Sequence, residues 1–147
     1  MQIRLLGAAD AAAYRALRLR GLQEHPQAFT SSYEEDLQHP QQVTAARLAS
    51  ATHAFWGAFE GGKLVGMVGL ERERRAKNRH KATVIGMYVA GEAGGRGVAG
   101  ELLQALLAQA RGEGLESLVL TVTEGNDKAR RLYEAAGFRS FGIEPRA

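Results

Sequence analysis

The chain has 147 residues, of which 45% are hydrophobic and 24% charged, with a formal net charge of +3 at pH 7. This length and composition suit one packed domain, so we expect residues 1–147 to form a single unit. The absence of cysteine excludes disulfides, thiolate metal sites and a covalent route through a protein thiol. The four histidines lie far apart, with no carboxylate at metal-ligand spacing, so we expect no metal.

The N-terminal stretch carries Asp10 and several arginines where a signal peptide would need an uninterrupted apolar run. No segment of the sequence approaches the length of a membrane span. We therefore expect a cytoplasmic protein that has no membrane partner.

The N-terminal half is predicted to begin with one strand and a helical region. The apolar spacing and the capping signals predict a strand over 1–6, a helix from Asp10 to before Pro26, a capping box at Ser32–Glu35 and a helix from Pro40 to about Leu48. The pattern then changes to that of strands. Two apolar runs, 54–59 and 63–70, are joined by Glu60-Gly61-Gly62 and predict a hairpin.

A basic segment follows the hairpin. Six of the 19 lysines and arginines fall between Arg72 and Lys81. Such a run is most often a solvated loop, because like charges repel and stay hydrated. The alternatives are a patch for an acidic partner or phosphate, and a nucleic-acid surface. No aromatic residue interleaves the run, so we do not expect a nucleic-acid partner.

The C-terminal half is predicted to alternate strands and helices. The expected elements are a buried strand over 82–90, a glycine-rich loop, an amphipathic helix from Val98, a strand over 115–123, a helix from Asn126 to Ala136 and a short strand over 138–143. Gly137 is well placed to end the last helix in the left-handed conformation. The order of elements predicts an α/β (α+β) fold with a meander followed by crossovers.

The glycine-rich loop lies between a buried strand and the start of a helix. Unpaired backbone N–H groups and the positive end of the helix dipole make such a turn an anion site, although a plain flexible turn is the simpler interpretation. A nucleotide-triphosphate loop is excluded, because no Lys-Ser or Lys-Thr follows the glycines. A dinucleotide fingerprint should come in the first βα unit, whereas this loop comes after the meander.

The stretch MYVAGEAGGRGVAGELL, residues 87–103, resembles the signature of the GNAT superfamily of acyl-CoA-dependent N-acyltransferases. In that signature a strand ends in a short bulge and a (Gln/Arg)-x-x-Gly-x-(Gly/Ala) loop leads into a helix. Gly97 and Ala99 match the last two positions, Gly95 matches a common third glycine, and Gly94 stands where the family prefers Arg or Gln. The second family element is matched by Asn126, Ala129, Leu132, Tyr133, Gly137 and Phe138.

The resemblance implies a mixed, mostly antiparallel central sheet flanked by about four helices. It also implies transfer of an acetyl (acyl) group from acetyl-CoA to a primary amine, of a small molecule or of a protein, by direct attack on the thioester. The positions it assigns to the cofactor are Met87, Val89, Gly94, Gly95, Arg96, Gly97, Val98, Ala99, Gly100, Asn126 and Tyr133. The Val89 N–H would polarise the carbonyl, and Tyr133 would protonate the leaving thiolate.

Simpler interpretations stand beside these roles. Arg96 can be a solvent-exposed turn residue, Tyr133 a core aromatic, and Asn126 a helix cap. The general base is open: many members carry a Glu near the place of Thr83, and no carboxylate lies from Lys81 to Val89. The candidates are Glu71, Glu34, Glu35, Glu124, His80 or a water relay.

The C-terminal end is shorter than the family pattern, which normally closes with a hairpin. The strand over 115–123 would then keep an open edge, an association hazard. Either residues 138–143 fill that place or a second subunit supplies a strand, so we expect a homodimer. An acyl-CoA N-acyltransferase is the favoured function. The departures at Thr83, Gly94 and this end are the reason to keep an alternative, a catalytically weak or inactive acyl-CoA-binding sensor or interaction module.

Overall fold

The computed structural model describes residues 1–26, 29, 32–73, 80–122 and 127–139. Its centre is a five-stranded sheet in the order β1-β2-β3-β4-β5. The strands are β1 (Gln2–Leu5), β2 (His53–Glu60), β3 (Lys63–Arg72), β4 (Lys81–Val89) and β5 (Ser117–Val119). Neighbouring strands pair antiparallel except for β4 and β5, which pair parallel. The predicted mixed, mostly antiparallel sheet is confirmed.

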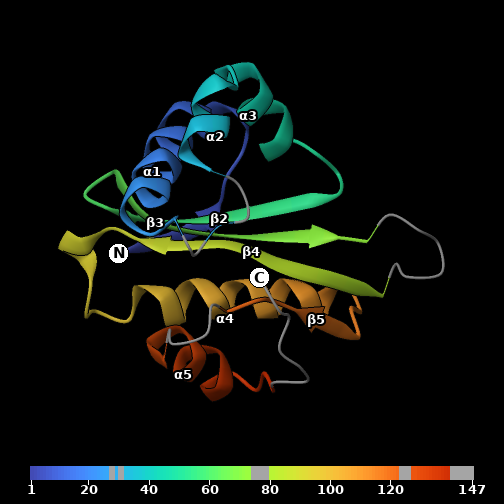
Figure 1. Ribbon diagram of the computed structural model, residues 1–147. Helices are drawn as coiled ribbons and strands as arrows, with labels where there is room; N and C mark the ends of the chain where they lie inside the picture. The colour runs from blue at the N-terminus through green and yellow to red at the C-terminus, as the bar shows by residue number, and fades with distance from the viewer. Residues whose placement is uncertain (27–28, 30–31, 74–79, 123–126, 140–147) are drawn as a thin grey trace.

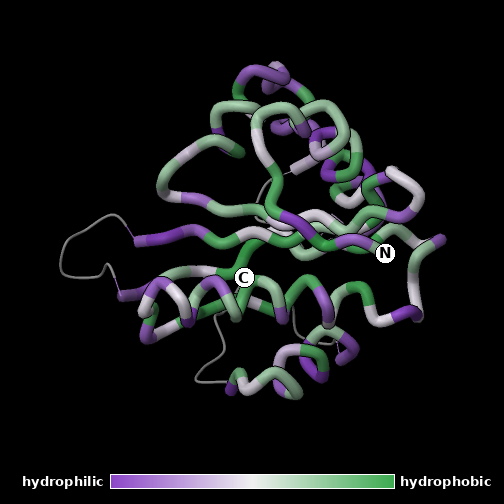
Figure 2. The backbone as a smooth tube through the Cα atoms, turned by 180° about the vertical axis from the view of Figure 1, so that it is seen from behind, coloured by the Kyte–Doolittle hydropathy of each residue, from purple (hydrophilic) through white to green (hydrophobic). Residues whose placement is uncertain are grey.

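Helices cover both faces of the sheet (Figure 1). One face carries α1 (Ala11–Glu24), α2 (Tyr33–Gln38) and α3 (Gln41–Leu48), and the other carries α4 (Val98–Gly112) and α5 (Asp127–Ala135). The described residues thus hold five α-helices, where about four were expected. Figure 2 shows apolar residues gathered along the strands and on α4, with hydrophilic residues at the outer turns.

Two apolar clusters hold the layers together, one on each face of the sheet. The cluster beneath α4 contains five buried positions of the apolar helical face: Val98, Leu102, Leu103, Leu106 and Leu107. Ala110 is buried as well, whereas Ala99, predicted for the same face, is only partly buried. The cluster beneath α1 and α3 contains Tyr14, Phe55, Met67 and Tyr88. The helical and strand periods thus sort side chains between the two faces.

A bulge in β4 shapes the sheet next to the loop. Gly86 has a φ of +61°, a left-handed value that favours glycine, and the register to β3 shifts by one residue around it. The parallel pairing of β4 with β5 ends at Thr83 and Val119. Beyond Thr83, the outer edge of β4 has no strand partner among the described residues.

The strand predicted over 115–123 is shorter in the structure, where β5 spans Ser117–Val119. Its pairing stops where β4 approaches the bulge, so the rest of the predicted strand has no ladder to join. Phe138 and Arg139 are not in a strand, and the remainder of the strand predicted over 138–143 lies outside the described residues. Gly137 has a φ of +106° after α5, as predicted.

In the described part of the chain, no helix is long and apolar enough to cross a membrane.

Candidate functional site

The glycine-rich loop leaves β4 through a short 3₁₀ turn, Gly91–Ala93, and enters α4 at its N-cap, Gly97. Gly95 and Gly97 both have a φ of +76°, a conformation that costs other L-residues roughly 1–2 kcal/mol. Two of the glycines are therefore needed to give the loop its shape.

The loop exposes a continuous set of unpaired amides. The amides of residues 95–100 donate to no carbonyl in the described part of the chain, whereas the next one, of Glu101, donates to Gly97 (3.1 Å). Gly94 differs, because its amide is already bound to the Gly91 carbonyl (3.1 Å). Six consecutive amides that have no carbonyl partner among the described residues, at the positive end of a 15-residue helix, can hold an anion such as a pyrophosphate.

Charged side chains brace the loop from two sides. The Arg20 guanidinium of α1 binds the Glu92 carboxylate through two hydrogen bonds of 2.6 and 2.9 Å, and it lowers the pKa of Glu92 to about 2. Arg96 binds Glu60 at the end of β2 (2.5 Å) and donates to the Glu92 carbonyl (3.1 Å). The side chain of Arg96 thus lies against the hairpin turn while remaining half exposed.

The edge of β4 next to the loop offers further backbone donors. The Ala90 amide donates to the Val65 carbonyl of β3 (2.8 Å). Because successive amides of a strand point to opposite sides, the amide of Val89 points away from β3, and so does that of Met87. No described strand pairs with this edge. A ligand lying along it could accept and donate hydrogen bonds as an added strand does.

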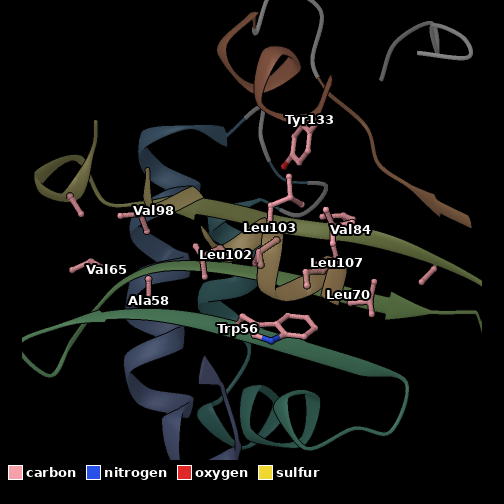
Figure 3. Close-up of a cluster of buried hydrophobic side chains, with 14 residues drawn as sticks. Trp56, Ala58, Val65, Leu70, Val84, Val98, Leu102, Leu103, Leu107 and Tyr133 are labelled. Atoms are coloured by element: carbon pink, nitrogen blue, oxygen red, sulfur yellow. The ribbon is translucent and has the colours of Figure 1, made fainter. Parts of the chain in front are cut away.

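Tyr133 lies on α5 with only 8% of its surface exposed, and its ring packs edge-on against Phe138 (5.7 Å between centroids). Figure 3 shows the ring entering the core cluster with its hydroxyl toward Leu103 of α4. Burial raises the pKa of Tyr133 to about 12. Among the described residues, its hydroxyl makes no hydrogen bond, and no fully buried side-chain oxygen lacks a partner. The core interpretation and the catalytic one are therefore both compatible with its position.

The candidates for a general base are dispersed. Glu71 of β3 accepts a hydrogen bond from His53 Nε2 (3.0 Å) and faces Thr83 of β4 in the register. Glu34 and Glu35 lie in the first turn of α2, where the amide of Glu35 donates to Ser32 Oγ.

The structure gives little information on the remaining candidates, His80, Glu124 and Asn126. The described bonds of His80 are made by its carbonyl, which accepts the amides of Glu116 and Ser117. Glu124 and Asn126, the latter assigned to the cofactor, lie outside the described residues. Among the residues that the structure describes, no three His, Asp or Glu side chains gather as a metal site would require, and the expectation of no metal stays a prediction.

Sequence reasoning missed three features of this region. It gave no role to His53, to the pairing of Arg20 with Glu92, or to the left-handed Gly86. All three depend on contacts between segments distant in the chain. A glycine within an otherwise apolar, β-branched run was the available signal for the bulge.

Comparisons with known proteins agree with the geometry. The model of the acetyltransferase (GNAT) family matches residues 19–138. The chain is 38% identical over 100 residues to the N-alpha-acetyltransferase RimI of Mycobacterium tuberculosis, and the match covers 67% of this chain and 60% of the relative.

Two solved structures show the same fold. An acetyltransferase of the GNAT family from Streptococcus pneumoniae is 26% identical with a TM-score of 0.78, covering 96% of this chain and 85% of that one. A predicted acetyltransferase from Clostridium acetobutylicum, solved with acetyl-CoA, is 18% identical with a TM-score of 0.74, covering 97% and 94%. None of these matches supports a non-catalytic sensor. With its family model matched over most of its length, the chain belongs to the acetyltransferase (GNAT) family.

Proposed function

We propose that this protein transfers an acetyl group from acetyl-CoA to a primary amine. The observation that carries the proposal is the run of six free amides, residues 95–100, at the N-terminus of α4. Family membership and the likeness to named acetyltransferases support it.

The cofactor would bind mainly through backbone groups. The amides of Gly95 to Gly100 donate to the pyrophosphate, and the pantetheine arm extends along the free edge of β4 at Met87 and Val89. Gly94, whose own amide is bound within the loop, contributes space beside the phosphates. Arg96 adds positive charge when it exchanges Glu60 for a phosphate oxygen. The family resemblance assigns Asn126, which lies outside the described residues, to the pantetheine arm.

The reaction is a direct displacement. The amine nitrogen attacks the thioester carbon, the carbonyl oxygen gains negative charge, and the C–S bond breaks to release coenzyme A. The outward N–H of Val89 donates to the developing oxyanion, where a fixed donor lowers the barrier. The attacking nitrogen, which becomes positively charged, loses a proton to solvent or to a base, and the product is an amide. No cysteine exists to form an acyl-enzyme.

Tyr133 is the proposed acid for the departing sulfur. Its pKa of about 12 keeps the hydroxyl protonated at neutral pH. A thiol titrates near pH 8.5, so complete transfer of the proton to the thiolate is uphill by roughly three pKa units, or ~5 kcal/mol. We therefore expect the hydroxyl to act chiefly by donating a charge-assisted hydrogen bond to the sulfur as the bond breaks.

The broader setting is proposed as well. The protein acts in the cytoplasm, its residues form one domain over 1–147, and it associates as a homodimer. The outer edges of β1 and β5 have no strand partner among the described residues, which supports association through a sheet edge. Light scattering of the purified chain measures the oligomeric state directly.

Initial rates of coenzyme A release with acetyl-CoA and a panel of primary amines test the proposed function. Mass spectrometry of the amine shows whether the amine, and not water, has accepted the acetyl group. Turnover that saturates in both substrates supports an enzyme. Binding of acetyl-CoA without turnover over the whole panel would instead favour the sensor.

A further inference from the structure

A pocket of about 470 Å³ lies at the start of β4, away from the glycine-rich loop. Four strands contribute to its wall, through His53, Glu71, Thr83 and Val119. The sheet register pairs these residues in sequence, His53 with Glu71, Glu71 with Thr83, and Thr83 with Val119. They therefore form one row across β2, β3, β4 and β5, because directly paired residues point to the same face.

The row lies on the sheet face that carries α1 to α3. Phe55 and Ile85, each two residues further along its strand, belong to the cluster beneath those helices. Figure 1 shows β3 and β4 extending past α1–α3 at this end of the sheet. Among the described residues, no helix residue contributes to the wall of the pocket.

Glu71 is held in place and is still accessible. Its carboxylate binds His53 Nε2 (3.0 Å), and its side chain is 52% exposed. The other nitrogen of His53 lies 3.0 Å from Thr52 Oγ1, and the ring stacks on Phe55 with an interplanar angle of 7°. Glu71 thus presents an oriented carboxylate to the pocket, with His53 as its positioning residue.

The cations described beside Glu71 do not neutralise it. Arg72 is bound by Glu113 through hydrogen bonds of 2.7 and 2.5 Å. Glu73 and Lys81, at the rim, carry opposite charges. What the row offers a ligand is therefore an array of acceptor oxygens, from Glu71 and Thr83.

The distance along β4 decides what Glu71 can do. Met87, the nearer of the outward amides beyond the bulge, lies four positions after Thr83, which corresponds to roughly 13 Å of extended strand. A glutamate side chain does not reach that far, so Glu71 does not remove a proton from an amine attacking at Met87 or Val89. It can contact another part of the same acceptor.

We propose that the row of His53, Glu71 and Thr83 is a subsite for a second cationic group on the acceptor, held by the Glu71 carboxylate. This inference rests on the proposed acetyl transfer and names its preferred acceptors: amines whose second ammonium lies roughly 13 Å from the reacting nitrogen, the span from Thr83 to Met87.

Three series of matched acceptors test the subsite: α,ω-diamines of increasing chain length, monoamines of the same lengths, and ω-amino acids. We expect kcat/KM for the diamines to peak at the length that spans the two points and to exceed that of the matched monoamine about tenfold. Glu71→Gln should remove this preference by raising KM while kcat changes little, as loss of one charge-assisted hydrogen bond predicts. Glu71→Lys should shift the preference toward the ω-amino acids.

Glu134→Gln, which removes an exposed carboxylate of α5, is the matched control and should keep the preference. Equal kcat/KM for diamines and monoamines, a wild-type preference for ω-amino acids, or a fall in kcat rather than a rise in KM in Glu71→Gln would overturn the subsite while leaving acetyl transfer in place. If no amine turns over, calorimetric binding of the diamines to the protein saturated with coenzyme A still decides. Affinity that depends on Glu71 supports the subsite, and affinity that does not, or no binding, rejects it.

Discussion

The two ends of β4 differ in the groups that they offer to a ligand. At its C-terminal end and in the following loop, the available chemistry lies in the backbone: the amides of residues 95–100, which have no carbonyl partner in the described part of the chain, and the outward N–H groups of the strand edge. At its N-terminal end the chemistry lies in side chains, chiefly the Glu71 carboxylate with its His53 partner. A common ligand would meet backbone donors at one end and a specific charge at the other.

This difference suggests a division of roles. Backbone groups bind the cofactor that the family shares, and side chains select the acceptor of one protein. Backbone donors can bind acetyl-CoA whatever side chains the loop carries, provided that the local φ and ψ angles are kept. Side chains such as Glu71 can change from one protein to another without disturbing the sheet. We therefore expect the loop to respond to changes of backbone geometry and the pocket to respond to changes of charge.

The largest effect on the rate should come from Tyr133, the side chain proposed to act on the leaving sulfur near the C-terminal end of β4. Tyr133→Phe keeps the ring in the core but removes the hydroxyl, so kcat should fall about 10- to 100-fold, as loss of a hydrogen bond to a developing charge predicts. Steady-state rates measure this. KM for acetyl-CoA within about twofold of wild type shows that binding is retained, and unchanged kcat would reduce Tyr133 to a core residue.

Alkaline unfolding examines the same residue without catalysis. The folded pKa of Tyr133, about 12, lies above the ordinary value near 10, so its contribution to stability is complete below pH 10 and is lost as the pH rises to 12. A raise of two units corresponds to ~2.7 kcal/mol. Denaturant unfolding at several pH values should show a steeper decline for wild type than for Tyr133→Phe. Identical slopes would mean that the hydroxyl is not desolvated.

A smaller effect is expected when the loop backbone is strained. Gly97→Val places a β-branched residue at a φ of +76° and should raise KM for acetyl-CoA about tenfold, from a strain of roughly 1–2 kcal/mol. Gly112→Ala, in the last turn of α4, has open space around the added methyl group and serves as the control. Equal KM values for the two variants would contradict a backbone-built cofactor site.

The smallest effect should follow removal of a brace. Arg20→Ala deletes the ion pair with Glu92, and because both side chains are well exposed the loss should stay below about 1 kcal/mol, or fivefold in KM for acetyl-CoA. Arg20→Lys should recover only part of it, since lysine lacks the bidentate fork. A much larger loss would show that the side chain of Arg20 itself takes part in binding, and would contradict a cofactor site made of backbone groups.

Most of the fold was predictable because apolar periodicity reports it directly. The inward face of α4 and the β2–β3 hairpin follow from patterns within a few residues of each other. The length of β5 does not follow from such a pattern, because it depends on where β4 bends at Gly86. The φ angle of a glycine in a strand cannot be predicted from the sequence around it.

The candidate site divides in the same way. The loop was recognisable because its glycines and the helix start are contiguous. The pairing of His53 with Glu71 was not, since counting outward from the Gly61-Gly62 turn pairs His53 with Leu70. A bulge between Ala58 and Phe59 shifts the register by one residue and brings Glu71 opposite His53. A shift of one residue moves a side chain to the other face of a strand, and no local pattern reveals it.

Thermal unfolding with and without acetyl-CoA tests the central claim, that the loop and the edge of β4 hold this cofactor. At about 100 times its dissociation constant, a ligand that binds only the folded protein adds roughly 2.7 kcal/mol, or an increase of roughly 5–10 °C in Tm. We expect this increase for wild type and for Gly112→Ala, and a much smaller one for Gly97→Val. No increase for wild type at millimolar acetyl-CoA, in a chain that unfolds cooperatively, would contradict the claim.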